Sequence, residues 1–326
     1  MAVYTDLSDQ ELADLVAGYD LGRALAFKGI AEGVENSNFL LETEAGRFIL
    51  TIFEKRVARG DLPFFMNIME TLAARGVPAP RPMRNREGAL FSEVRGKACT
   101  IITFLTGVSP KRPNAAQCRA VGVGLAQMHE ALRDFSEVRD NALSLDAWAP
   151  LVRPRAALAD SLRPGLAADV ETDLAALEAA WPQGLPIGVI HADLFPDNTL
   201  FLGDEAKGLI DFYFACTDAL AYDLAIGLNA WCFEADGSFN LTKGRAMIAG
   251  YERVRPLDDA EVAALPVLAR GAALRFMLTR LVDWLNVPPG ALVRPKDPLE
   301  YYRKLRFHER VATAADYGRA APGAAA

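Results

Sequence analysis

A histidine, two aspartates and an asparagine, all side chains of the kinds used in catalysis, lie within the stretch HADLFPDNTLF, which covers residues 191–201. His191, Asp193 and Asn198 follow the spacing H-x-D-x-x-x-x-N, and Asp211 comes soon afterwards in the apolar run GLIDF. A free carboxylate can accept the proton of an attacking hydroxyl group. Carboxylate and amide oxygens bind Mg²⁺, which takes its remaining ligands from water and substrate phosphates. Together these residue types indicate phosphoryl transfer.

Short apolar runs flank these residues and predict how they lie. The run PIGVI leads into the polar stretch, and TLFLGDEAKGLIDF has the pattern of a hairpin. Asn198 stands at the start of this hairpin and Asp211 at its end, so we expect the two side chains to bind one cation. The alternative is turn chemistry, in which Asp193 and Asn198 bond only their own backbone. We interpret His191 as structural.

The remaining pattern predicts an α+β protein of two lobes. The meander over residues 25–55, a helix over 62–75 and the runs GALFSEV and KACTIITFL predict an antiparallel sheet with one long helix. Ser8 and Glu11 form a capping-box pattern before a short helix. After FLTGVSPKRP the pattern is mainly helical, over about 114–132, 166–180, from 220, from 242 and over 259–285. We expect lobes over residues 1–105 and 106–326, with ligands between them.

Composition restricts the class of protein. The 326 residues carry a net charge of −7, which argues against a broad nucleic-acid surface. The four cysteines form no C-x-x-C pair, which is typical of free thiols in a reducing compartment. The start of the chain lacks a signal-peptide pattern, and no run approaches the roughly 20 apolar residues of a membrane span. We expect a cytoplasmic protein without nucleic-acid or membrane partners.

The polar motifs resemble those of a known superfamily. HADLFPDN followed by LIDF is similar to the H-R-D-L-x-x-x-N and D-F-G loops of protein-kinase-like enzymes, with Ala192 in place of the arginine. Asp223 follows Asp211 too closely for a phosphorylatable activation loop. The chain therefore resembles the small-molecule branch with aminoglycoside phosphotransferases and choline kinases. Within this branch it resembles the bacterial homoserine kinases to about residue 310, notably in GVENSNFLLETEAGRFILTIFEKR and GLIDFYFACTDALAYDLAIGLNAWCFE.

The resemblance implies an activity and site residues. It implies transfer of the γ-phosphate of ATP to the side-chain hydroxyl of L-homoserine, a step of threonine biosynthesis. Asp193 would be the catalytic base, and Asn198 and Asp211 would hold Mg²⁺. Asp223 would bond the backbone of the catalytic loop. The protein-kinase-like fold implies a two-lobed architecture with a small sheet-rich first lobe.

On the nucleotide side the resemblance is incomplete. EGVENSN, residues 32–38, occupies the phosphate-loop position without a glycine-rich pattern. Gly33 lies in this turn, and we expect backbone N–H groups around Asn36 and Ser37 to approach the phosphates. The hinge TFLTG is expected to offer backbone groups to the adenine edge, from Thr103, Phe104 and Leu105.

Two charged residues of the superfamily are missing. In FILTIFEK the usual strand lysine falls on Thr51, and its helical glutamate partner falls near Phe65. The absence of both charged residues is physically consistent, because the absence of only one would leave the other as an unpaired buried charge. Lys55 is then the nearest candidate for the β-phosphate, unless it is only a solvated strand end.

Acceptor recognition is the least specified part of the site. The carboxylate of homoserine suits an arginine fork, so Arg275 and Arg280 are candidates, and Tyr213 is a candidate for the pocket wall. Another kinase of the branch, acting on choline, methylthioribose or an aminoglycoside, is an alternative. Two further alternatives are a non-catalytic nucleotide-binding protein and a metal-dependent hydrolase. We expect a monomer or a homodimer.

Overall fold

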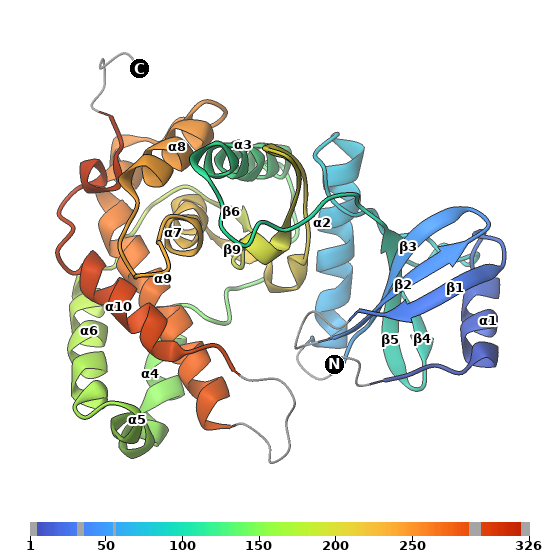
Figure 1. Cartoon of the computed structure of the whole chain (residues 1–326), viewed down its shortest axis with the longest axis horizontal. Coiled ribbons are helices and arrows are strands. Elements are labelled where there is room, and N and C mark those ends of the chain that lie inside the picture. The colour runs from blue at the N-terminus through green and yellow to red at the C-terminus, as the bar shows by residue number, and fades with distance from the viewer. Residues whose placement is uncertain (1–4, 31–35, 55–56, 287–294, 321–326) are drawn as a thin grey trace. The chain divides into compact units, whose positions relative to one another are not determined.

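The computed structural model describes residues 5–30, 36–54, 57–286 and 295–320. The chain forms two compact units, Met1–Gly107 with Lys207–Tyr213, and Val108–Ala206 with Phe214–Ala326. The functional division at residues 105 and 106 stays a prediction. The fold class is the predicted one, an antiparallel sheet unit and a mainly helical unit (Figure 1).

The first unit is a five-stranded antiparallel sheet with two helices. The sheet has the order β1-β2-β3-β5-β4, and the predicted meander and helix are present. The elements are α1 (Asp9–Ala17), β1 (Ala24–Gly29), β2 (Ser37–Thr43), β3 (Gly46–Ile52), α2 (Leu62–Ala74), β4 (Ser92–Val94) and β5 (Lys97–Thr103). The capping box of Ser8 and Glu11 forms as expected. GALFSEV is a strand only in its last three residues, because β4 pairs only with the short stretch Lys97–Cys99 of β5.

Helices pack on both faces of this sheet. On one face Leu12 and Val16 of α1 share a core with alternate strand residues such as Leu41 and Leu50. On the other face Thr100 contacts Met66 of α2, with 3.5 Å between Oγ1 and Sδ. Figure 1 shows α1 and α2 on either side of the strands. The segment Lys207–Tyr213 also belongs to this unit, and its Leu209 N–H donates to the Pro78 carbonyl at 3.0 Å.

The second unit is built mainly from helices. Its helices are α3 (Ala115–Ala131), α4 (Leu145–Val152), α5 (Ala156–Leu162), α6 (Leu166–Ala180), α7 (Leu220–Trp231), α8 (Leu241–Glu252), α9 (Asp259–Leu285) and α10 (Pro298–His308). Asn114 forms a capping box at the start of α3. A short sheet of β6 (Ile187–Ile190) with β9 (Cys216–Ala219) completes this unit. Another short sheet pairs β7 (Thr199–Leu202) with β8 (Glu205–Leu209), whose last three residues belong to the Lys207–Tyr213 segment of the first unit.

Helix α9 forms the centre of the second unit. It packs against α4, α6, α7 and α10, and in Figure 1 it runs between them. Among the described residues it is the helix long and apolar enough to cross a membrane by length and composition. Because 72% of its apolar window is buried inside the protein, this composition is typical of a core helix.

Candidate active site

The loop that carries Asp193 lies in the second unit, between β6 and β7. This Asp193 loop covers residues 191–198 and ends in a short 3₁₀ turn over Pro196–Asn198. Asn198 Nδ2 donates to the carbonyl oxygen of Asp193 at 2.8 Å and to its Oδ2 at 3.2 Å. The structure thus brings these two predicted site residues together. The Asp193 N–H donates to Nδ1 of the buried His191 at 3.3 Å, so His191 contacts the loop from within.

Backbone strain marks both predicted loops. Ala192 has φ 62° and Asp211 has φ 64°, in the left-handed region that costs a non-glycine residue roughly 1–2 kcal/mol. Such conformations persist only where the surroundings hold them. One precedes Asp193 directly and the other is Asp211 itself, so the sites singled out by sequence motif coincide with two of the strained positions.

Asp223 of α7 holds the start of the Asp193 loop. Its buried carboxylate accepts the His191 N–H on Oδ2 at 2.6 Å and the Ala192 N–H on Oδ1 at 3.0 Å. His129 Nε2 lies 3.2 Å from the same Oδ2. Burial opposes ionisation, yet the interactions with His129 and His191 lower the pKa of Asp223. The loop backbone is therefore anchored to a charged, fully buried group.

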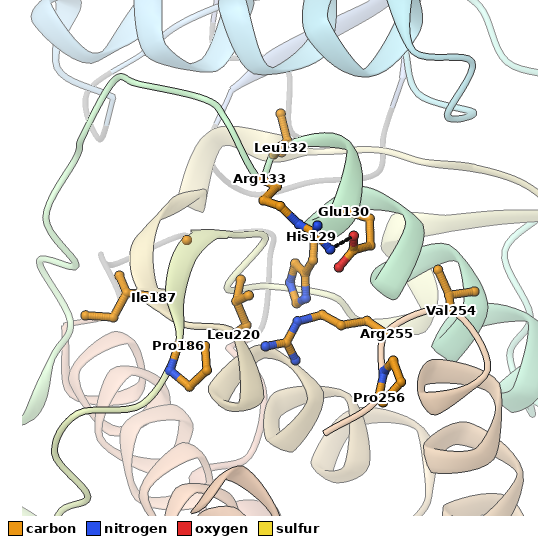
Figure 2. Close-up of a pocket in the computed structure, with 11 residues that line it drawn as sticks. His129, Glu130, Leu132, Arg133, Pro186, Ile187, Leu220, Val254, Arg255 and Pro256 are labelled. Carbon is orange, nitrogen blue, oxygen red and sulfur yellow. Dashed lines mark hydrogen bonds and ion pairs between the residues drawn. The ribbon is translucent and has the colours of Figure 1, made fainter. Parts of the chain in front are cut away.

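His129 connects Asp223 to a surface pocket of the second unit. Its Nδ1 lies 2.7 Å from the hydroxyl of Tyr251. Figure 2 shows His129 in the wall of this pocket of about 380 Å³, with Arg255 beside it and Arg133 paired with Glu130. Arg255 also pairs with Glu261, at 2.9 Å between Nη1 and Oε1. The pocket contains none of the predicted site residues, and its charged side chains pair within the protein.

Asp211 is exposed and belongs to the first unit. Asn198 belongs to the second unit, so a shared cation between them stays a prediction. Tyr213, in the same segment as Asp211, packs edge-on against Phe53 and Phe65, with ring centroids 5.0 and 5.9 Å apart. Burial raises the pKa of Tyr213. Its ring is thus a packing element of the first unit.

The described part of the phosphate-loop stretch is tied into the sheet. The Asn36 side-chain oxygen accepts the Glu54 N–H at 3.4 Å, and Ser37 Oγ donates to Glu54 Oε1 at 2.6 Å. Ser37 Oγ also accepts the Thr5 N–H at 3.0 Å. Gly33 and Lys55 lie outside the described residues. Both described side chains are thus engaged in the sheet, and the expected approach of the backbone N–H groups to the phosphates stays a prediction.

A neutral pair occupies the position of the missing lysine. Thr51 is 1% exposed, and its hydroxyl donates to Asn38 Oδ1 at 2.8 Å. Phe65, at the position of the missing glutamate, is 1% exposed and packs against Tyr213. An ion pair of Lys97 with Glu54 is present elsewhere in this unit and was missed by sequence reasoning. It lies beside Ser37, at the face of the sheet opposite Thr51.

The hinge amides are partly engaged within the first unit. The Thr103 N–H donates to the Arg81 carbonyl at 3.0 Å, and the Phe104 N–H donates to the Arg47 carbonyl at 3.3 Å. The guanidinium of Arg47 lies 4.8 Å from the centroid of the Phe104 ring. The N–H groups of Thr103 and Phe104 thus bond within the protein, and the expected contact of the backbone of residues 103–105 with adenine stays a prediction.

Both candidate arginines of the acceptor pocket contact other groups of the protein. Arg275 Nη1 donates to the Ala192 carbonyl at 2.7 Å. Arg280 Nη1 donates to Glu300 Oε2 at 2.7 Å and to the Asp297 carbonyl at 3.3 Å. Their contact with an acceptor stays a prediction.

Sequence reasoning missed one cation beside the Asp193 loop. Lys296 Nζ lies 3.5 Å from Asp197 Oδ2 and 5.2 Å from the centroid of the Phe195 ring. Its side chain is 62% exposed. The residue stands far from the motif in sequence, so no local spacing could have found it.

Comparison with known proteins identifies one family and relatives that match nearly the whole chain. The profile described as the phosphotransferase enzyme family matches residues 26–257. The homoserine kinase of Xanthobacter autotrophicus is 62% identical over 321 residues, covering 98% of this chain and 100% of that protein. The homoserine kinase of a Methylobacterium species is 63% identical over 318 residues, covering 98% and 99%.

Solved structures share the fold at low identity. An amicoumacin kinase in complex with AMP-PNP, Ca²⁺ and Ami superposes with a TM-score of 0.69 at 16% identity, covering 97% of this chain and 96% of that one. A microcompartment-associated aminopropanol kinase gives a TM-score of 0.65 at 16% identity, covering 96% and 99%.

Proposed function

Because this chain belongs to the phosphotransferase enzyme family, we propose that it transfers the γ-phosphate of ATP to the side-chain hydroxyl of L-homoserine. The product is O-phospho-L-homoserine, an intermediate of threonine biosynthesis. The observation that carries the proposal is identity of 60–63% over nearly the whole chain to several homoserine kinases. The chain is a phosphotransferase with an alcohol group as acceptor.

Asp193 is the catalytic base of the proposed reaction. Its carboxylate takes the proton of the homoserine hydroxyl as the oxygen bonds to the γ-phosphorus and the bond to the β-phosphate oxygen breaks, releasing ADP. Asn198 donates to Asp193 Oδ2 at 3.2 Å and so orients the carboxylate. Positioning and electrostatic stabilisation lower most of the barrier.

Mg²⁺ would be held by Asn198 and Asp211. Asn198 uses its Nδ2 for Asp193, which leaves Oδ1 as the ligand atom, and Asp211 carries an exposed carboxylate. Two oxygen ligands suit a cation that keeps several waters and binds through substrate phosphates. When bound, the ion neutralises charge on the β- and γ-phosphates.

The first unit supplies the nucleotide contacts in this proposal. The Leu105 backbone pairs with adenine, and the backbone around Asn36 and Ser37 approaches the phosphates. At Thr51, the position of the strand lysine, a neutral hydrogen bond to Asn38 is formed, and Lys55 stays the candidate for the β-phosphate contact. We place the enzyme in the cytoplasm as a monomer or homodimer, without nucleic-acid or membrane partners.

ADP release from Mg-ATP tests the acceptor. The assay compares L-homoserine with choline, methylthioribose, kanamycin, L-serine and no acceptor. We expect release that depends strongly on L-homoserine. Release with another acceptor alone would keep the reaction class and discard homoserine. Nucleotide binding without release for any acceptor would favour a non-catalytic nucleotide-binding protein.

A further inference from the structure

Arg275 is a buried cation in the middle of α9. The residue is only 2% exposed, and its guanidinium carbon lies 4.5 Å from the centroid of the Phe276 ring. A buried guanidinium is retained where its hydrogen bonds are specific, because its desolvation is costly. Its Nη1 donates to the carbonyl oxygen of Ala192, at 2.7 Å.

The residue that accepts this bond is the strained one. Ala192 has φ 62°. Its N–H donates to Asp223 Oδ1 at 3.0 Å and its carbonyl accepts from Arg275. Two buried charged groups of opposite sign, from α7 and α9, therefore hold the polar groups of one residue. This pair of bonds over-determines a conformation that alanine would otherwise leave.

The consequence concerns the base. Ala192 directly precedes Asp193, so the left-handed turn at Ala192 determines the direction in which the Asp193 side chain leaves the backbone. The superfamily motif has arginine at position 192, whereas here an arginine from a distant helix reaches the backbone at that position. The guanidinium of Arg275 thus contacts the backbone of the Asp193 loop and does not point to solvent.

We propose that Arg275 is a positioning residue that fixes Asp193 through the Ala192 carbonyl, and not a ligand of the acceptor carboxylate. This inference rests on the proposed function, because its test measures phosphorylation of L-homoserine. It assigns to Arg275 an effect on turnover without an effect on acceptor binding, because a misplaced base reduces the rate of a complex that still forms.

Three variants test this role. Arg275→Met removes the donor at similar length, Arg275→Lys keeps a positive charge that can still donate, and Arg270→Lys is the control. Arg270 lies on the same helix, but its Nη2 pairs with Asp173 Oδ1 at 2.6 Å. The measurements are kcat, KM for both substrates and the dissociation constant of L-homoserine, with circular dichroism as the check of folding.

We expect Arg275→Met to lower kcat about 10²-fold, the scale of a misplaced reacting group, with homoserine affinity within about three-fold of wild type. Arg275→Lys should recover kcat to within about ten-fold of wild type, because one N–H donor suffices for one carbonyl. Arg270→Lys should leave kcat unchanged.

Two results would overturn the proposal. One is a homoserine dissociation constant raised ten-fold or more with kcat retained, which would make Arg275 an acceptor ligand. The other is wild-type kcat in both Arg275 variants. If Arg275→Met does not fold, Arg275→Gln takes its place, because its neutral side chain is too short to make the 2.7 Å bond to the Ala192 carbonyl; wild-type kcat in that variant would overturn the proposal. If wild type uses another acceptor, the proposed substrate fails but the same comparison is made with that acceptor.

Discussion

Asp223→Asn is the perturbation whose magnitude follows most directly from the structure. The carboxylate accepts the N–H groups of His191 and Ala192 and contacts His129, all within the buried core of the second unit. An asparagine has nearly the same shape but keeps only one acceptor oxygen. One backbone N–H of the Asp193 loop then faces an amide group that cannot accept.

The expected loss comes from that unpaired donor. A buried N–H left without an acceptor costs about 1–3 kcal/mol, and the total stability of a domain is about 5–15 kcal/mol. Asp223→Asn should therefore lower the free energy of unfolding by about 1–3 kcal/mol. Because the same bonds position the loop, kcat should fall about 10²-fold.

Urea denaturation and steady-state kinetics measure the two effects. The control is Asp20→Asn, because Asp20 is 84% exposed and its pair with Arg86 contributes roughly 0–1 kcal/mol. The pKa of Asp223 is lowered in the folded protein, from an ordinary value of 3.8. Its stabilisation is therefore present above pH 3.8 and is lost as the pH falls through the lower folded pKa.

The difference in stability between wild type and Asp223→Asn should thus stay constant at neutral pH and narrow only below pH 3.8. The reasoning would be refuted by a stability loss no larger than that of the control. It would also be refuted by a difference that grows as the medium becomes acidic.

Three further predictions concern other parts of the protein. Thr51→Lys should restore the superfamily residue without raising activity and should lower the free energy of unfolding by about 3–5 kcal/mol, because the charge would be buried without a partner; a rise in kcat would contradict this. Asp211→Ala should remove the Mg²⁺-dependent part of ATP affinity in calorimetry, and an unchanged Mg-ATP dissociation constant would exclude it from the metal site. Gly122→Ala should destabilise the protein by about 1–3 kcal/mol in thermal unfolding, because the added Cβ would lie 2.1 Å from the Met247 carbonyl oxygen. The control is Gly60→Ala, whose Cβ would meet no atom within 4 Å. Equal loss of stability in the two variants would contradict the packing argument.

Elements with strong local signals could be predicted from the sequence. The expected capping box at Ser8 is present, and a helix begins after Asn114 as expected. The helices over 166–180 and 259–285 have the expected bounds. These segments are long and periodic, and their ends are fixed by side chains close in sequence. The Asp193 loop was found for a similar reason, because its motif is contiguous.

Elements that depend on distant contacts were missed. α4 contains Pro150, which breaks the pattern of a helix, and α5 is only a short helix beside it. β9 has the sequence CTDA, and its strand forms by pairing with β6. The helix α10, over Pro298–His308, was also missed; it packs against α9.

The site divides in the same way. Asp193 and Asn198 lie in one loop, so their spacing in sequence already predicts their contact. The bond from Arg275 to the Ala192 carbonyl joins residues 83 positions apart. No spacing predicts it, and the side chain was interpreted from its charge alone. The position of Lys296 beside Asp197 depends likewise on tertiary packing.

The most direct test of the account is the turnover of Asp193→Asn with Mg-ATP and L-homoserine. Asparagine keeps the shape of the side chain but cannot accept the hydroxyl proton. We predict that kcat falls by about 10² or more, the scale of general-base loss, while the ATP dissociation constant is unchanged. Turnover close to wild type would contradict the assignment of Asp193 as the catalytic base.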